Sequence, residues 1–312
     1  MISLAPEQEA TVKFLIQFFC TVVLLASGCR SLQSTMNPAP PLQQAQVEGA
    51  TLSYVEQGQG EAVVFVHGTF SDHRVWEGHR ENIAKRYRYI ALDQRYFGTA
   101  SWTDTGAKYS VSTHADDLAM FIDRLGVGPV HLVGFSYGGA VVIVLAARRP
   151  ELVRSLFMYE PALGSIVTDP STQKILAEER KELGPSVAAS KSNDQAMAVR
   201  LFVDWVDGQK GSFDALSADI RQVLLENART LPPQFAAPPP PVVHCTQLAQ
   251  MKVPVTIGKG QQSRPYFTVL ADATHQCMPG SKLVVFPNAR HMAPVKNGAA
   301  VNAAILAHLN GP

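Results

Sequence analysis

The chain has 312 residues, of which 46% are hydrophobic and 17% are charged. This composition provides a full apolar core and excludes general disorder. The 27 basic and 26 acidic side chains nearly cancel, and no run of Lys and Arg is interleaved with aromatic residues, so nucleic acid is not an expected partner.

The N-terminus has the pattern of an export signal. Residues 14–26 (FLIQFFCTVVLLA) form a 13-residue apolar run followed by the small residues Ser27 and Gly28, and such a run is too short to span a bilayer comfortably. We therefore predict a signal peptide over residues 1–28; the alternative is a buried helix packed on the domain. Leu25 to Cys29 resembles a bacterial lipobox, which implies that Cys29 becomes a lipid-modified first residue.

We accordingly expect a bacterial periplasmic protein or a membrane-anchored lipoprotein, with membrane contact only through this anchor. Residues 29–46 are polar and contain Pro, which predicts a tether. Removal of the signal peptide and acylation of Cys29 leave Cys245 and Cys277 in an oxidising compartment. Those two residues form either a disulfide or two buried free thiols.

From Val47 onward, short β-branched runs alternate with helical patterns. This alternation predicts an α/β fold with a mostly parallel sheet and helices on both faces. A helix is expected over Val111–Leu125, because its apolar residues have helical spacing and Gly126 follows. The expected strands are Ala50–Glu56, Ala62–His67, Tyr89–Asp93, Val130–Phe135 and Arg154–Tyr159.

The alternation stops after Tyr159. Residues 161–251 are mostly helical in pattern, and we interpret them as a helical cap inserted after the sixth strand, over a site at the carboxyl edge of the sheet. The core is then 47–160 and 252–312. Helices are expected in the cap over Gln173–Glu182, Asp194–Val206 and Ser212–Thr230, followed in the core by strands Val253–Ile257 and Lys282–Phe286 and a helix Pro294–Leu309.

A nucleophile motif follows one of the buried strands. Residues 134–138, Gly-Phe-Ser-Tyr-Gly, match G-x-S-x-G between a strand and an Ala/Val-rich helix. A nucleophile on such a sharp turn needs neighbours without side chains, and Gly134, Gly138 and Gly139 supply them. The helix N-terminus also favours a developing anion. Ser136 is therefore the candidate nucleophile.

With this motif the chain resembles the lid-bearing, esterase-like members of the α/β-hydrolase family, over roughly Val47 to Leu309. His67-Gly68-Thr69-Phe70 looks like the family's His-Gly turn, which implies that the backbone N–H groups of Thr69 and Tyr137 form the oxyanion hole. His67 itself is interpreted as a structural residue. Residues 93–98 resemble the family's D-x-R-G-x-G loop, with Tyr96 in place of the middle Gly.

A serine hydroxyl needs a base and an acid behind that base. Residues 288–294 resemble the family's catalytic-His loop, so His291 is the expected base. Many members carry the acid after the next-to-last strand, where this chain has Ser263, and Asp272 is the next carboxylate. Other members, including certain lactonases and dehalogenases, carry it one strand earlier. Glu160 has that position, and we prefer it to Asp272.

The predicted reaction is hydrolysis of a small to medium hydrophobic carboxylic ester or lactone through an acyl-enzyme on Ser136, without a cofactor or metal. C–C bond hydrolysis or cofactor-free perhydrolysis on the same triad are the alternatives, and a noncatalytic envelope binding lipoprotein is a third. The sequence identifies neither the acyl nor the alcohol group of the substrate, nor the oligomeric state. The cap residues Leu201, Phe202, Trp205, Leu216, Leu224 and Leu225 are expected to pack the cap on the core or to line the pocket.

Overall fold

The computed structural model describes residues 39–102, 104–296 and 298–311. The predicted signal peptide, Cys29 and the first part of the predicted tether lie outside the described residues. No helix in the described part of the chain is long and apolar enough to cross a membrane.

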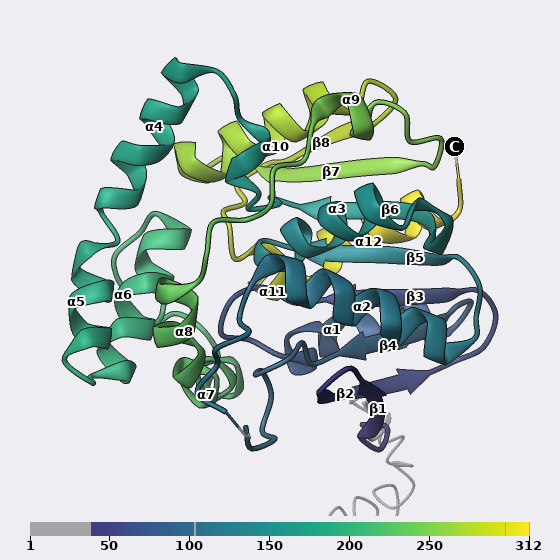
Figure 1. Ribbon diagram of the computed structural model, residues 1–312, viewed down its shortest axis with the longest axis horizontal. Coiled ribbons are helices and arrows are strands. Elements are labelled where there is room, and N and C mark those ends of the chain that lie inside the picture. Colours follow the sequence, from purple (N-terminus) through teal and green to yellow (C-terminus); the bar gives the residue numbers. More distant parts are fainter. Residues whose placement is uncertain (1–38, 103, 297, 312) are drawn as a thin grey trace, which may run out of the picture. The chain divides into compact units, whose positions relative to one another are not determined.

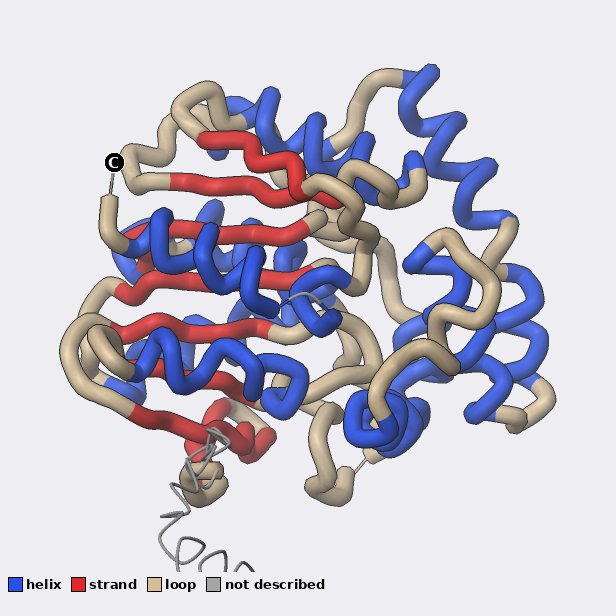
Figure 2. The backbone as a smooth tube through the Cα atoms, turned by 180° about the vertical axis from the view of Figure 1, so that it is seen from behind, coloured by secondary structure: helices blue, strands red, loops and turns tan. Residues whose placement is uncertain are grey.

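The described residues contain one eight-stranded sheet with the strand order β1-β2-β4-β3-β5-β6-β7-β8 (Figures 1 and 2). The pairs β1·β2 and β2·β4 are antiparallel, and all later pairs are parallel. The predicted α/β fold with a mostly parallel sheet is confirmed. The strands are β1 Gln43–Val47, β2 Ala50–Gln57, β3 Ala62–Val66, β4 Arg88–Leu92, β5 Val130–Phe135, β6 Val153–Tyr159, β7 Val255–Gly260 and β8 Lys282–Phe286.

Burial follows the position of each strand in the sheet. Every residue of the central strands β3 and β5 is buried, as expected where helices cover both faces. The edge strand β8 is buried only at Phe286. Helices α1 (Glu77–Ala84) and α12 (Gly298–Leu309) pack together on one face, and α2 (Val111–Leu125) and α3 (Tyr137–Arg148) on the other (Figure 1).

Residues 161–254, which follow Glu160 and precede β7, are what we call the helical insertion. It leaves the sheet at the carboxyl end of β6, and its helices α4 to α8 gather at the left in Figure 1. Its α-helices are α4 Pro170–Lys181, α5 Gly184–Lys191, α6 Gln195–Asp207, α7 Ala218–Glu226, α8 Leu231–Ala236 and α9 Cys245–Leu248. Two further α-helices of the core are α10 Pro265–Cys277 and α11 Ala293–Lys296.

Several sequence predictions differ from the structure, and one of them is the terminal helix expected over Pro294–Leu309, which is α11 and α12 in the structure. Residues 43–46 belong to β1 rather than to a tether, because their backbone pairs with β2. Helix α5 was not expected, and the long helix predicted over Ser212–Thr230 is reduced to α7 and a short 3-10 turn. Strand β7 begins at Val255 rather than Val253.

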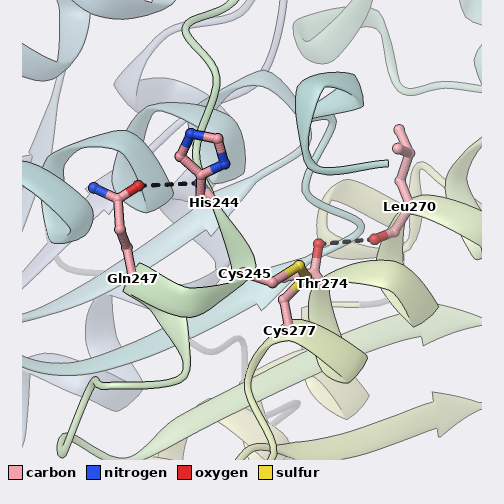
Figure 3. The surroundings of a disulfide bond; sticks show 6 residues. All are labelled: His244, Cys245, Gln247, Leu270, Thr274 and Cys277. Carbon is pink, nitrogen blue, oxygen red and sulfur yellow. Dashed lines mark hydrogen bonds between the residues drawn. A yellow bond between two sulfur atoms is a disulfide. The ribbon is translucent and has the colours of Figure 1, made fainter. Parts of the chain in front are cut away.

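A disulfide joins the end of the helical insertion to the core (Figure 3). Cys245 begins α9, Cys277 ends α10, and their Cα atoms lie 4.6 Å apart. Of the two states left open by the sequence, the structure contains the bonded one. The link fixes the segment that leads from the insertion back to β7.

Candidate active site

Ser136 lies on the tight turn between β5 and α3 and is 8% exposed. Its backbone φ is 53°, in the left-handed region where a non-Gly residue is strained. The turn is possible because its neighbours are small: a Cβ on Gly138 would lie 2.3 Å from the carbonyl oxygen of Val66, and one on Gly139 would lie 2.7 Å from the Cα of Pro161. The glycines therefore provide the space that the motif requires.

His291 lies in the loop between β8 and α11, with its imidazole Nε2 3.0 Å from Ser136 Oγ. Two aromatic rings hold the imidazole. Phe267, from α10, stacks on it with 3.6 Å between ring centroids and an interplanar angle of 18°, and the Phe135 ring lies 5.0 Å away. The serine proton thus faces a buried nitrogen of fixed orientation.

Glu160 directly follows β6 and is fully buried. Its Oε2 lies 2.6 Å from Nδ1 of His291, and its Oε1 accepts a hydrogen bond of 2.7 Å from the backbone N–H of Gly260. Because a carboxylate only accepts, Nδ1 carries the proton and Nε2 is left free to accept one from the serine. Glu160 also has a positive φ of 45°, so two residues with strained backbones, Ser136 and Glu160, belong to one hydrogen-bonded chain.

The alternative acid lies elsewhere. Asp272 is in α10, and its carboxylate pairs with Lys259 Nζ at 2.5 Å, with 42% of the side chain exposed. The structure therefore brings Ser136, His291 and Glu160 together and leaves Asp272 out. Gly260 ends β7, so the Glu160 carboxylate lies beside the strand after which many family members carry their acid.

The residues after Glu160 are fixed to the nucleophile turn. The backbone N–H of Ala162 donates to the carbonyl of Ser136 at 3.0 Å, and Pro161 packs against Gly139. Leu163 is fully buried. The first residues of the helical insertion are therefore part of the site.

The two predicted oxyanion residues flank Ser136. Tyr137 is the first residue of α3, and a first-turn N–H has no partner within its own helix. Thr69 follows β3 and lines the same cavity as Ser136. Its hydroxyl accepts a hydrogen bond of 3.3 Å from Gln234 Nε2 in α8. A tetrahedral oxyanion needs preorganised N–H donors, and both residues predicted to supply them lie at or next to Ser136.

The Tyr137 side chain is bound to α2 and is not among the residues that line the cavity. Its hydroxyl lies 2.7 Å from Nδ1 of His114. Burial raises the pKa of Tyr137 well above its usual value and lowers the pKa of His114 to about 3. The pair is therefore neutral near pH 7, and it anchors the ring of the residue that follows the nucleophile.

His67 supports the turn before Thr69. Its Nδ1 donates to the carbonyl of Gly68 at 2.8 Å, and its Nε2 accepts from the backbone N–H of Gln94 at 3.1 Å. Burial lowers its pKa, so the imidazole stays neutral, consistent with a structural role. Tyr96, in the neighbouring loop, has a φ of 75°, the conformation for which a glycine would be preferred.

An apolar cavity opens beside Ser136, between the core and the helical insertion. The core contributes Thr69, Phe70, Ser71, Val75, Phe135, Ser136, His291, Met292 and Val295, and the insertion contributes Phe202, Val203, Val206 and Leu224. No Lys, Arg, Asp or Glu is among these lining residues of the described chain. The lining of the cavity thus favours an uncharged, apolar group over an ionised one.

Sequence reasoning missed the cavity residues Val203 and Val206 and the aromatic ring of Phe267. Of the six apolar cap residues singled out, Phe202 and Leu224 reach the cavity, whereas Leu225 is 41% exposed. Phe267 belongs to no motif, and its stacking on His291 depends on how α10 packs. Helical spacing alone does not show which apolar residues line a pocket and which only pack the helix on the core. It also does not show which aromatic residue will contact the imidazole.

One cluster of the described residues has the donor types of a metal site. Potential ligand atoms of Asp72, His73 and Asp93 lie within 4.8 Å of one another. Both carboxylates are already engaged, since Asp72 pairs with the Arg74 guanidinium at 2.6 Å and Asp93 accepts from the His73 ring at 2.7 Å. Arg74 therefore offsets the charge of Asp72, and the His73 ring engages Asp93.

The chain is similar in sequence to one protein family and to individual known proteins. A family model described as "alpha/beta hydrolase fold" matches residues 61–297. The chain is 28% identical over 252 residues to a 2-(acetamidomethylene)succinate hydrolase from Mesorhizobium japonicum, covering 77% of this chain and 85% of the relative. It is 28% identical over 278 residues to the dihydrolipoyllysine-residue acetyltransferase component of an acetoin cleaving system from Cupriavidus necator, covering 88% and 70%.

Solved structures share the fold at lower identity. A carboxylesterase from Bacillus subtilis superimposes with a TM-score of 0.67 at 20% identity, covering 87% of this chain and 92% of that one. A bromoperoxidase from Bacillus anthracis gives a TM-score of 0.71 at 20% identity, covering 86% and 100%.

Proposed function

Because the chain belongs to the α/β-hydrolase family, we propose that it is a serine hydrolase that cleaves a small to medium hydrophobic carboxylic ester or lactone. The observation that carries the proposal is the buried chain of contacts from Ser136 Oγ through His291 to Glu160, at 3.0 and 2.6 Å. This arrangement activates a hydroxyl for acyl transfer.

The proposed reaction has two halves. Ser136 Oγ attacks the carbonyl carbon while its proton moves to His291 Nε2, and the N–H groups of Thr69 and Tyr137 stabilise the oxyanion. His291 then gives that proton to the departing alkoxide, which leaves as the alcohol. A water molecule then attacks the acyl-enzyme while its proton moves to the same nitrogen, and His291 returns that proton to Ser136 Oγ as the carboxylic acid leaves. Glu160 stabilises the imidazolium in both halves.

The cavity supports the choice of substrate class. Its lining residues are apolar apart from Thr69, Ser71, Ser136 and His291, so an ionised substrate would lose its hydration there without a partner charge. We therefore propose an uncharged substrate, covered by the helical insertion acting as a cap. The substrate named for the relative from M. japonicum is a succinate, and the apolar lining favours a different preference here.

The test is covalent labelling of the protein with a fluorophosphonate, followed by peptide mapping. A single adduct on Ser136, absent after heat denaturation and diminished in His291→Ala, is the expected result. A panel of short-chain esters, lactones and peroxide with acetate then separates ester hydrolysis from perhydrolysis. Well-folded protein that gives no adduct and hydrolyses no panel member would favour a noncatalytic binding protein.

We also propose that the protein is exported and anchored through an acylated Cys29. The apolar run and the residues before Cys29 support this. Mass spectrometry of the N-terminal peptide should show a lipid-modified Cys29, and Cys29→Ser should move the protein from the membrane to a soluble fraction. An unprocessed N-terminus would refute the proposal.

A further inference from the structure

A buried carboxylate that the triad does not use connects the helical insertion to the catalytic loop. Asp207 is the last residue of α6 and is 1% exposed. Its carboxylate accepts from the backbone N–H of Met292 at 3.1 Å, from Ser212 Oγ at 2.8 Å and from Lys296 Nζ at 2.6 Å. Two of these three donors belong to the core, and one of them follows His291 directly.

The His291 loop is therefore held from two sides. On the core side, the hydroxyl of Tyr159 donates to the carbonyl of Arg290 at 2.9 Å. On the insertion side, Asp207 accepts from Met292 through its carboxylate and from Arg290 Nη1 through its backbone carbonyl, the latter at 3.4 Å. The residues immediately before and after the base are thus fixed by different parts of the chain.

The Asp207 carboxylate is held in its ionised form. Burial raises the pKa of Asp207, but Lys296, Ser212 and the Met292 N–H together outweigh burial and hold it below its usual value. Asp207 therefore stays ionised near neutral pH, and a hydrogen bond to an ionised acceptor is stronger than one to a neutral acceptor.

We propose that Asp207 is a positioning residue, which uses the helical insertion to hold the His291 loop at the distance from Ser136 that proton transfer needs. This inference rests on the proposed serine hydrolase function. Without the carboxylate, the N–H of Met292 loses its acceptor and the loop can move. A displacement of about 1 Å at a catalytic group can cost about 100-fold in rate.

Three variants test this role. Asp207→Ala removes both side-chain acceptor oxygens and keeps only the backbone carbonyl that accepts from Arg290, whereas Asp207→Asn keeps one side-chain carbonyl oxygen for Met292 and nearly the same shape. The matched control is Asp204→Ala on the same helix. The Asp204 carboxylate accepts from the N–H groups of Gly211 and Phe213 at 2.8 and 3.0 Å, both inside the insertion. The control therefore perturbs the insertion without removing the contact to the His291 loop.

The readouts are kcat and KM for a p-nitrophenyl ester, the rate of fluorophosphonate labelling of Ser136, and Tm. We expect Asp207→Ala to lower kcat and the labelling rate about 100-fold, with KM changed less than about threefold. Asp207→Asn should lose about 10-fold, because part of the contact persists. Asp204→Ala should lower Tm and keep kcat within about threefold of the wild type.

The outcomes separate the two proposals. Wild-type protein that neither hydrolyses esters nor reacts with the phosphonate overturns the proposed function and the positioning role together. Active wild-type protein with a kcat for Asp207→Asn and Asp207→Ala no lower than for Asp204→Ala overturns only the positioning role. A rise in KM at constant kcat would also overturn it, since Asp207 would then act on substrate binding.

Discussion

Replacing Glu160 with Gln tests the assignment of the acid most directly. The substitution keeps the shape of the side chain but removes the charge that lies 2.6 Å from His291 Nδ1. With charge centres about 4 Å apart and an effective dielectric constant near 20, a carboxylate stabilises an imidazolium by about 4 kcal/mol. The amide can also donate to Nδ1 and select the tautomer that cannot accept the serine proton.

We therefore expect kcat for Glu160→Gln to fall by about 10³- to 10⁴-fold. Stability should change little, within about 1 kcal/mol or 2–4 °C in Tm, because the amide oxygen can still accept from the N–H of Gly260. The assay is steady-state hydrolysis of a p-nitrophenyl ester between pH 5 and 9, with thermal unfolding measured on the same samples.

The matched control is Asp272→Asn, which removes the alternative acid and breaks its surface pair with Lys259. Exposed pairs of this kind contribute at most about 1 kcal/mol, so kcat should be unchanged. Turnover of Glu160→Gln within about threefold of the wild type, or an equal loss in Asp272→Asn, would refute the reasoning.

Three further predictions concern the fold around the site. Gly138→Ala should lower Tm and abolish labelling of Ser136, because the new Cβ would lie 2.3 Å from the carbonyl of Val66; an active, equally stable variant would contradict this. Reducing the Cys245–Cys277 disulfide, which spans 32 residues, should lower the free energy of unfolding by about 3–4 kcal/mol, as urea titrations with and without reductant would show. His308 has a pKa lowered to about 4 by burial, with a smaller effect from neighbouring His131, so the unfolded state gains a proton first as the pH falls. Stability should therefore decrease from about pH 6.5 down to about pH 4. The fall of the urea midpoint over this range should be smaller in His308→Gln than in the wild type but not absent, because burial also lowers the pKa of His67 and His114; an equal fall in both proteins would contradict the prediction.

The catalytic candidates could be predicted because each follows a strand of the same parallel sheet. Ser136 follows β5, Glu160 follows β6, and His291 lies in the loop after β8. The carboxyl ends of parallel strands lie at the same edge of the sheet, so residues that directly follow neighbouring strands are close in space. The same rule explains why Asp272, inside α10, does not reach His291.

Elements stabilised by distant partners were not predictable in this way. Strand β1 (QQAQV) has little apolar character and exists through its pairing with β2. Helix α5 begins with Gly-Pro and buries Ser186, whose hydroxyl bonds to the carbonyl of Ala198 in α6. In both cases tertiary contacts outweigh local propensity. The residues near each element in the sequence do not indicate the strand or helix that stabilises it.

The attachment of residues 160–162 to the nucleophile turn limits how this enzyme can be re-engineered. Exchanging the helical insertion with that of another family member is an obvious route to a new substrate range. A crossover placed at the end of β6 would replace Glu160, Pro161 and Ala162, and with them the proposed acid and the N–H that donates to the carbonyl of Ser136. The upstream junction of a functional chimera therefore belongs after Ala162, and the donor segment must accept a chain that enters it from the catalytic turn.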